Sequence, residues 1–174
     1  MNKQIVQINL GMVKAFLVKG EKYILVDTGL PQSFDKINKF FIENKINPKD
    51  ISTPVEPRSP LAKLIMKLMK QPKIESFKAD LLIEEDFNLN KFGIDGKVIH
   101  TPGHTGGSLS VLLNNGEAIV GDMLSGKNKK NHTLAKYPFI WNDFNKLKDS
   151  IEMLLNKGAK VFYNSHGDGS NVHG

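Results

Sequence analysis

Cysteine is absent from the sequence, and this absence limits the chemistry that the chain can perform. The 174 residues can form no disulfide and no thiolate zinc site, so a transition metal would have to be held by histidine, aspartate or glutamate. No apolar run approaches the roughly 20 residues that span a bilayer, and the opening MNKQIVQINLG lacks the apolar block of a signal peptide. We therefore expect a cytoplasmic protein with no transmembrane segment.

Arginine is also nearly missing, although the chain is basic. The net charge of +6 comes almost wholly from lysine, since Arg58 is the only arginine. Nucleic-acid-binding proteins use arginine for bidentate contacts to phosphate and guanine, so we expect no nucleic-acid partner. A hydrophobic content of 40% and a charged content of 24% are typical of a globular protein, and the length predicts a single domain over residues 1–174.

Hydrophobic periodicity predicts an α/β fold. Alternation and β-branched residues indicate strands in QIVQINLG and in KAFLVKGEKYILVDTG, and a hairpin turn at Asn114-Asn115-Gly116 later in the chain. Helical spacing indicates a helix from Ser33, its predicted N-cap, to Lys45, and another in FNKLKDSIEMLLNKG that ends at Gly158. The segment NKINPKDIS points toward a further strand, and AKVFYNSHGDG is a final strand followed by a glycine-rich loop.

The sequence allows more than one role for each of two lysine-rich segments, a predicted helix over residues 59–70 and the loop from Ser125 to His132. The segment TPVEPRSP has three prolines in eight residues, which excludes a central strand, and an amphipathic helix should follow over residues 59–70. That helix packs on the domain or covers a cleft, or else it contacts a membrane surface or a partner. The loop from Ser125 to His132 is a solvated loop or attracts an anionic substrate.

Three polar residues stand where predicted strands end, and a fourth lies in a turn between two strands. Asp27 lies in VDTG, Asp122 in VGDM and His166 in NSHGDG, and His104 lies in the turn TPGHTGG. Catalytic and ligand residues favour such positions, because the sheet fixes the backbone while the loop leaves the side chain free to converge with others. Two further residues are expected to have structural roles. His100 should be a buried, hydrogen-bonded support residue, and Trp141 an aromatic of the core or of a cleft wall.

In these motifs the sequence resembles the metallo-β-lactamase superfamily. The pieces that carry the resemblance are ILVDTG, HTPGHTGGS, EAIVGDM and FYNSHG, which occur in the family's order and extend over nearly the whole chain. The resemblance implies an αββα sandwich, with metals at one sheet edge. It also implies that His104 ligates one metal, His166 another, that Asp122 bridges them, and that Asp27 orients a ligand as a supporting catalytic residue. Zinc, iron or manganese then activates water to attack an ester, thioester, lactone, amide or phosphodiester.

One family motif is missing from the sequence. The resemblance places a His-x-His-x-Asp-His motif after NPKDIS, yet no histidine occurs between Met1 and Ile99. The fold is therefore expected to carry a deletion of a central strand-loop-helix segment, which is either native or a difference between this chain and its gene. A catalytic zinc usually has three protein ligands, so the remaining residues could hold one ion or none.

Two interpretations of function follow. In the first, the chain is a hydrolase-like protein that acts on a small molecule and binds metal through His104, Asp122 and His166, with weak or no activity. In the second, it is a non-catalytic remnant or scaffold of the same fold, a pseudoenzyme. Losing a central strand would leave a sheet edge unpaired, and a second copy of the chain could cover that edge as a homodimer.

Overall fold

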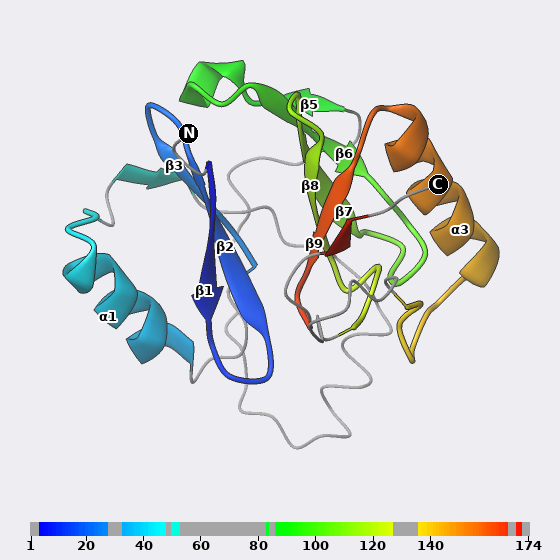
Figure 1. Cartoon of the computed structure of the whole chain (residues 1–174), viewed down its shortest axis with the longest axis horizontal. Helices are drawn as coiled ribbons and strands as arrows, with labels where there is room; N and C mark the ends of the chain where they lie inside the picture. The colour runs from blue at the N-terminus through cyan, green and yellow to red at the C-terminus, as the bar shows by residue number, and fades with distance from the viewer. Residues whose placement is uncertain are drawn as a thin grey trace.

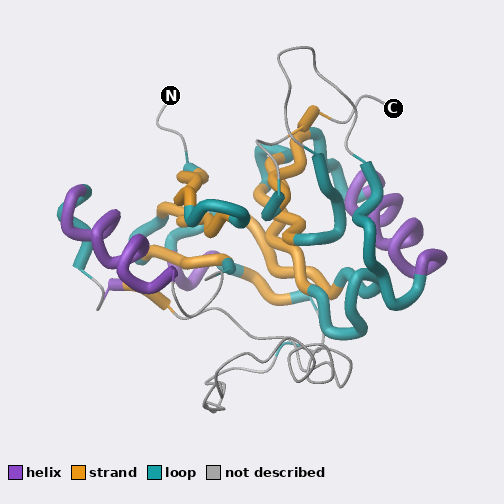
Figure 2. Tube along the Cα trace, turned by 90° about the horizontal axis from the view of Figure 1, so that it is seen from below, coloured by secondary structure: helices purple, strands orange, loops and turns teal. Residues whose placement is uncertain are grey.

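The structure is a computed structural model that describes residues 4–27, 33–47, 50–52, 83, 86–126, 136–166 and 170–171. In this part of the chain, two β-sheets face each other and a helix covers the outer side of each (Figure 1). Helix α1 (Phe34–Glu43) and helix α3 (Phe144–Asn156) lie at opposite ends of the molecule, as the second view also shows (Figure 2). The layers are therefore helix, sheet, sheet and helix, which confirms the predicted αββα class.

The first sheet has the strand order β1-β2-β3-β4. Its members are β1 (Ile5–Asn9), β2 (Lys14–Lys19), β3 (Tyr23–Val26) and β4 (Ile51–Ser52). The first three strands pair antiparallel through tight turns, whereas β4 follows α1 and pairs parallel to β3 through two residues. The sheet is therefore mixed, with β4 as a very short edge strand in the described part of the chain.

The second sheet has the strand order β10-β9-β8-β7-β6-β5. Its members are β5 (Phe87–Asn88), β6 (Gly96–His100), β7 (Leu109–Leu113), β8 (Glu117–Gly121), β9 (Val161–Asn164) and β10 (Ser170–Asn171). A short 3-10 helix, η3 (Asn90–Phe92), connects β5 to β6. Strands β5 to β8 form an antiparallel meander, and β9 returns through α3 to pair parallel to β8. Parallel pairing brings the carboxyl ends of β8 and β9 to the same edge.

The two sheets are packed by strands that are apolar on both faces. In β2, Phe16 and Val18 face the second sheet, while Ala15 and Leu17 face α1, and all four are buried. Successive side chains of a strand point to opposite faces, so an unbroken apolar run is what a strand between two packed layers requires. The aromatic ring of Phe16 meets Tyr163 of β9 edge-on at 6.1 Å. This contact joins the two sheets directly.

Helix α3 covers the outer face of the second sheet. Its Leu147 and Leu154 are fully buried against residues that alternate with the inter-sheet set, among them Ala118, Val120 and Phe162. On the other side, Ile37 and Phe41 of α1 pack on the first sheet. Each helix presents one apolar stripe at helical spacing, as its sequence predicts.

Most predicted elements are confirmed at their predicted positions. The turn at Asn114-Asn115-Gly116 joins β7 to β8, the segment NKINPKDIS ends in strand β4, and Gly158 ends α3 with φ of +96°. Ser33 occupies the N-cap of α1, but its side chain makes no capping hydrogen bond. The proline-rich segment and the helix predicted over 59–70 lie outside the described residues, as does His132.

None of the helices in the described part of the chain is both long enough and apolar enough to cross a membrane. The longest of them, α3, has one face on the core and a polar opposite face.

Candidate metal centre

The candidate site lies at the edge where β8 and β9 end. The β8–β9 register shifts between Ile119 and Gly121, and Gly121 has φ of +55°. A bulge bends its strand and re-aims the side chain that follows, so Asp122 leaves the plane of the sheet at this point. On the neighbouring strand, Asn164 is followed by Ser165 and His166. Parallel strand ends therefore bring Asp122 and His166 together.

His104 reaches the same edge from the turn between β6 and β7. This turn is held against the N-terminal end of α3. The backbone N–H groups of Asn142 and of Asp143, the N-cap of α3, both donate to the carbonyl of Gly103, at 2.9 and 3.0 Å. Gly103 has φ of +142°, and a Cβ atom placed there would lie 2.3 Å from Cα of Leu147. Only glycine allows this close approach. The glycine before His104 thus fixes where the histidine is presented.

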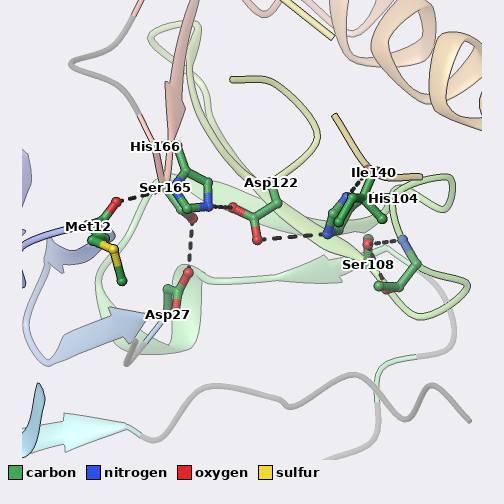
Figure 3. Close-up of polar contacts among 9 residues, drawn as sticks. Met12, Asp27, His104, Ser108, Asp122, Ile140, Ser165 and His166 are labelled. Atoms are coloured by element: carbon green, nitrogen blue, oxygen red, sulfur yellow. Dashed lines mark hydrogen bonds and ion pairs between the residues drawn. The ribbon is translucent and has the colours of Figure 1, made fainter. Parts of the chain in front are cut away.

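The three side chains form a row with Asp122 at its centre (Figure 3). Nε2 of His166 lies 3.3 Å from Oδ1 of Asp122, and Nε2 of His104 lies 3.8 Å from Oδ2 of the same carboxylate. The side chain of Asp122 is 37% exposed, so the row is half-buried and open to solvent on one side. The sequence-predicted residues His104, Asp122 and His166 are therefore brought together, as two histidine–carboxylate pairs that share one aspartate.

Backbone carbonyls orient both imidazoles. Nδ1 of His104 lies 2.9 Å from the carbonyl oxygen of Ile140, and Nδ1 of His166 lies 3.2 Å from that of Met12. A carbonyl oxygen only accepts hydrogen bonds, so in each ring Nδ1 carries the proton and donates it. In the neutral imidazoles, Nε2 then carries a lone pair and faces Asp122, which is the tautomer that ligates a metal ion through Nε2.

The chemistry of these donors fits a transition metal. Oδ1 of Asp122 is buried and, among the described residues, has no hydrogen-bond partner, although Nε2 of His166 is 3.3 Å away. Two ligands on one tetrahedral ion, each bonded at about 2.0–2.1 Å, lie about 3.3 Å apart. The 3.8 Å between His104 and Asp122 is wider than this spacing. The donors therefore fit better on the His166 side.

The small number of protein ligands limits how well the site could hold an ion. Across the ranges that the structure describes, no group of three or more His, Cys, Asp or Glu side chains is placed to hold one ion. Each side of Asp122 offers one imidazole nitrogen and one carboxylate oxygen. A structural zinc has four protein ligands and a catalytic zinc usually three. An ion here would need water or further groups to complete its coordination.

Asp27 stands beside the row and contacts it through a serine. Oγ of Ser165, a residue that is 1% exposed, donates to Oδ2 of Asp27 at 2.9 Å. The backbone of Ser165 also donates to the carbonyl of Gly121 and accepts from the N–H of Lys14, each at 3.0 Å. Ser165 therefore links both sheets immediately before His166. Asp27 itself has φ of +63°, a conformation that aspartate adopts more readily than most residues.

Two structural interpretations of the sequence need correction. His100 is exposed, not buried, because it ends β6 at the surface, where its Nε2 lies 2.9 Å from the carbonyl oxygen of Gly106. Of the two interpretations of Trp141, the core is wrong, since the residue is 45% exposed in the loop before α3, where it packs on Phe144 at 5.2 Å. The cleft wall stays a prediction. Ser165 was not predicted as a site residue, and its only signal in the sequence is its position directly before the histidine of NSHG.

Comparison by sequence identified no relative: no protein-family model matches the chain, and no curated protein matches it. Solved structures do match it, along almost its whole length. TTHA1623, in a di-iron-bound form, has a TM-score of 0.69 and 21% identity, over 96% of this chain and 93% of its own. The BLEG-1 B3 metallo-beta-lactamase has a TM-score of 0.68 and 17% identity, over 96% and 93%.

A third solved structure comes from an archaeon. The metallo-beta-lactamase superfamily protein ST1585 from Sulfolobus tokodaii has a TM-score of 0.65 and 18% identity, over 98% of this chain and 82% of its own. Identities this low are informative about the fold alone. Together with the two sheets, their flanking helices and the topology described above, these matches show that the chain has the metallo-β-lactamase fold.

Proposed function

We propose that the chain is a metal-dependent hydrolase-like protein whose ions bind at the row of His104, Asp122 and His166. The observation that carries the proposal is the contact of one carboxylate with two imidazoles, each turned with Nε2 toward it. The metallo-β-lactamase fold supports it, as does the di-iron-bound form of one structural neighbour. Asp122 would contact an ion on each side, with His104 on one and His166 on the other.

The residues of the chain would prepare the site before any metal arrives. The carbonyls of Met12 and Ile140 hold the two rings so that their Nε2 lone pairs face Asp122. Asp122 supplies the negative charge that a cation needs, and its buried Oδ1 has no competing hydrogen bond in the described structure. Asp27 would act as a positioning residue through Ser165, which precedes His166.

Zinc, iron and manganese all suit nitrogen and oxygen donors. When bound, such an ion lowers the pKa of a water molecule and polarises the carbonyl or phosphoryl group of a substrate. With one imidazole and one shared carboxylate for each ion, we expect weak binding and hence activity that depends on added metal. The reaction would be hydrolysis of a small-molecule ester, thioester, lactone, amide or phosphodiester.

The test measures metal content and hydrolysis on the same preparation. Protein purified without added metal is analysed for zinc, iron and manganese, and then assayed on a thioester, an ester and a phosphodiester as each metal is added. We expect hydrolysis that rises with metal concentration, is abolished by a chelator and is lost in Asp122→Asn. Asp149→Asn on the exposed face of α3 is the matched control and should behave as the unmodified protein does. A rate of hydrolysis that changes neither with added metal nor in Asp122→Asn would refute the proposal.

A non-catalytic scaffold is the second candidate, and one observation favours it. Strand β4 pairs with β3 only at Tyr23 and Ile24, so in the described residues Leu25 and Val26 have no β4 partner. Such an edge can pair with another chain, which would make a homodimer. Sedimentation velocity distinguishes the candidates when combined with the metal assay: a stable dimer that binds no metal supports the scaffold.

A further inference from the structure

The turn between β1 and β2 carries the carbonyl that orients His166. The N–H of Leu10 donates to the carbonyl of Val13 at 3.1 Å and closes this turn. Between these two residues, the carbonyl oxygen of Met12 lies 3.2 Å from Nδ1 of His166 (Figure 3). The orientation of the imidazole ring therefore depends on how firmly the turn is held.

Helix α1 contributes a lysine that contacts this turn. Nζ of Lys36 donates to the carbonyl of Leu10 at 2.8 Å, although the two residues are 26 positions apart in the sequence. A hydrogen bond from an ammonium group is stronger than one between neutral groups. In Figure 1, the turn and the N-terminal end of α1 lie at the same end of the first sheet. The lysine thus joins the helix to the turn.

The backbone of the turn is shaped to accept the lysine. Gly11 has φ of +111°, and a Cβ atom placed there would lie 3.3 Å from Nζ of Lys36. Glycine supplies both the positive φ and the space for the ammonium group. Oδ1 of Asn9 accepts a hydrogen bond from the N–H of Gly11 at 2.9 Å, as in an Asx turn. Two side chains, those of Lys36 and Asn9, therefore fix the first half of the turn.

The second half of the turn is bound to the strand that leads to His166. The N–H of Lys14 donates to the carbonyl of Ser165 at 3.0 Å. Met12 therefore lies between two anchors, the contact of Lys36 with Leu10 and the contact of Lys14 with Ser165. Without the first anchor, one end of the turn would be free to move while the other stays bound, and the carbonyl of Met12 would change its position.

We propose that Lys36 is a positioning residue for the metal centre. Its ammonium group fixes the turn, the turn fixes the carbonyl of Met12, and this carbonyl keeps the proton of the His166 ring on Nδ1. Nε2 then presents its lone pair toward Asp122. The inference rests on the proposed function and extends it to α1, a helix that contributes no side chain to the row of His104, Asp122 and His166.

The orientation of His166 is measured directly on the metal-free protein. Long-range ¹H–¹⁵N correlation spectra at pH 8.5 distinguish a neutral ring that is protonated on Nδ1 from one that is protonated on Nε2. In Lys36→Met, we expect His166 to change from the Nδ1–H form to a mixture of the two forms. His104 is the internal control, because its Nδ1 is bound to the carbonyl of Ile140 and should keep its proton in the same sample.

A second variant loosens the same turn without touching the helix. Asn9→Ala removes the hydrogen bond to the N–H of Gly11 and should produce the same change in the spectrum of His166. Lys36 and Asn9 are both exposed, so neither substitution disturbs the core. Lys36→Arg keeps a charged donor and should restore the Nδ1–H form.

Zinc affinity gives a second readout. Removing a group that hydrogen-bonds a metal-ligating histidine typically costs about 10–100-fold in metal affinity. Since Lys36 acts through one further contact, Lys36→Met should weaken zinc binding at least about threefold. Lys39→Met is the matched control and should leave the affinity unchanged. Lys39 lies on the same helix with a side chain that is 76% exposed and 3.8 Å from Glu43.

Failure of the Lys36 contact and failure of the proposed function give different results. His166 in the Nδ1–H form in both Lys36→Met and Asn9→Ala, or zinc affinity lost equally in Lys36→Met and Lys39→Met, would overturn the role of Lys36. If the ring changes as expected but the unmodified protein binds no metal, Lys36 orients His166 and the metal-dependent function fails. If hydrolysis depends on metal and the ring is unchanged in Lys36→Met, the function is supported and the role of Lys36 fails.

Discussion

Nε2 of His166 lies 3.3 Å from Oδ1 of Asp122, a buried oxygen that makes no hydrogen bond to any described residue. With Nδ1 of the same ring bound to the carbonyl of Met12, the neutral imidazole turns a lone pair toward a carboxylate. Two acceptors in contact repel each other unless a proton or a cation lies between them. The pair is therefore arranged to hold a positive charge. The hydrogen bond from Nδ1 of His166 to the carbonyl of Met12 keeps the imidazole ring in this orientation.

The first prediction concerns the turn that presents His104. A Cβ atom at Gly103 would lie 2.4 Å from the backbone nitrogen of Leu147, at a φ of +142°, whereas one at Gly106 would meet nothing within 4 Å. Gly103→Ala should lower the free energy of unfolding by about 3 kcal/mol or more. Gly106→Ala, in the same turn, should change it by less than about 0.5 kcal/mol. Urea denaturation followed by circular dichroism measures both, and equal effects would contradict the packing described for the turn.

The second prediction concerns the link between Asp27 and Ser165. Hydrogen bonds to charged groups contribute about 1.5–3 kcal/mol, so Ser165→Ala should lower the free energy of unfolding by roughly that amount. Asp27→Asn keeps an acceptor oxygen and tolerates positive φ, and should cost less than about 1 kcal/mol. Asp27→Gly removes the acceptor and also tolerates positive φ, so a double-mutant cycle of Ser165→Ala and Asp27→Gly should show a coupling of about 1 kcal/mol. If the two effects simply add, the side chains do not interact as described.

The third prediction compares the two helix N-caps. Oδ1 of Asp143 accepts a hydrogen bond from the N–H of Lys146 at 3.1 Å, while Ser33 makes no capping bond to α1. Replacing a capping residue with alanine costs about 1 kcal/mol. Asp143→Ala should therefore destabilise the protein by about that amount, and Ser33→Ala by less than half as much. Thermal unfolding ranks the two variants, and the reverse order would disprove the assignment of the caps.

The fourth prediction concerns alkaline pH. Burial, together with a hydrogen bond to Glu117 and its negative charge, raises the pKa of Tyr163 above its ordinary value. The folded state keeps this proton to higher pH than the unfolded state, in which tyrosine ionises near pH 10. Stability is therefore complete below about pH 10 and falls as the pH rises further, because the unfolded state then binds fewer protons.

Tyr163→Phe isolates this effect from the titration of lysines. The variant loses the bond to Glu117 and should be less stable at pH 8. Because phenylalanine does not ionise, the difference between the two proteins should narrow from pH 10 to pH 11.5. Urea titrations across this range measure the difference. A stability difference that stays constant with pH would show that the proton on Tyr163 is not linked to folding.

Much of the fold was predictable because its layers impose regular patterns on the sequence. The run KAFLVK in β2 is apolar on both faces because one face meets α1 and the other the second sheet. Glycines in the sequence indicated the turns. Polar residues at strand ends indicated the site, because Asp122 and His166 follow the neighbouring parallel strands β8 and β9. These features depend on residue type and spacing, which a single sequence contains.

The remaining features depend on atoms that carry no residue-specific signal. The carbonyls of Met12 and Ile140 orient the imidazoles, and every residue has such a carbonyl. Ser165 is recognisable only after folding brings the end of β9 into contact with Asp27, which follows β3. His100 was assigned to the interior from its place in a strand, but the strand ends there and its ring contacts a surface turn. Prediction from the sequence failed where function depends on backbone geometry.

The most direct test of the central claim is the contribution of each histidine to metal binding. The unmodified protein, His104→Asn, His166→Asn and the matched control His100→Asn are dialysed against zinc, iron(II) and manganese(II), and bound metal is measured by elemental analysis. We predict that the unmodified protein binds at least one of these ions, that each site variant binds it at least tenfold more weakly, and that His100→Asn binds it as well as the unmodified protein. An unmodified protein that binds none of the three metals, or variants that all bind equally, would contradict the account.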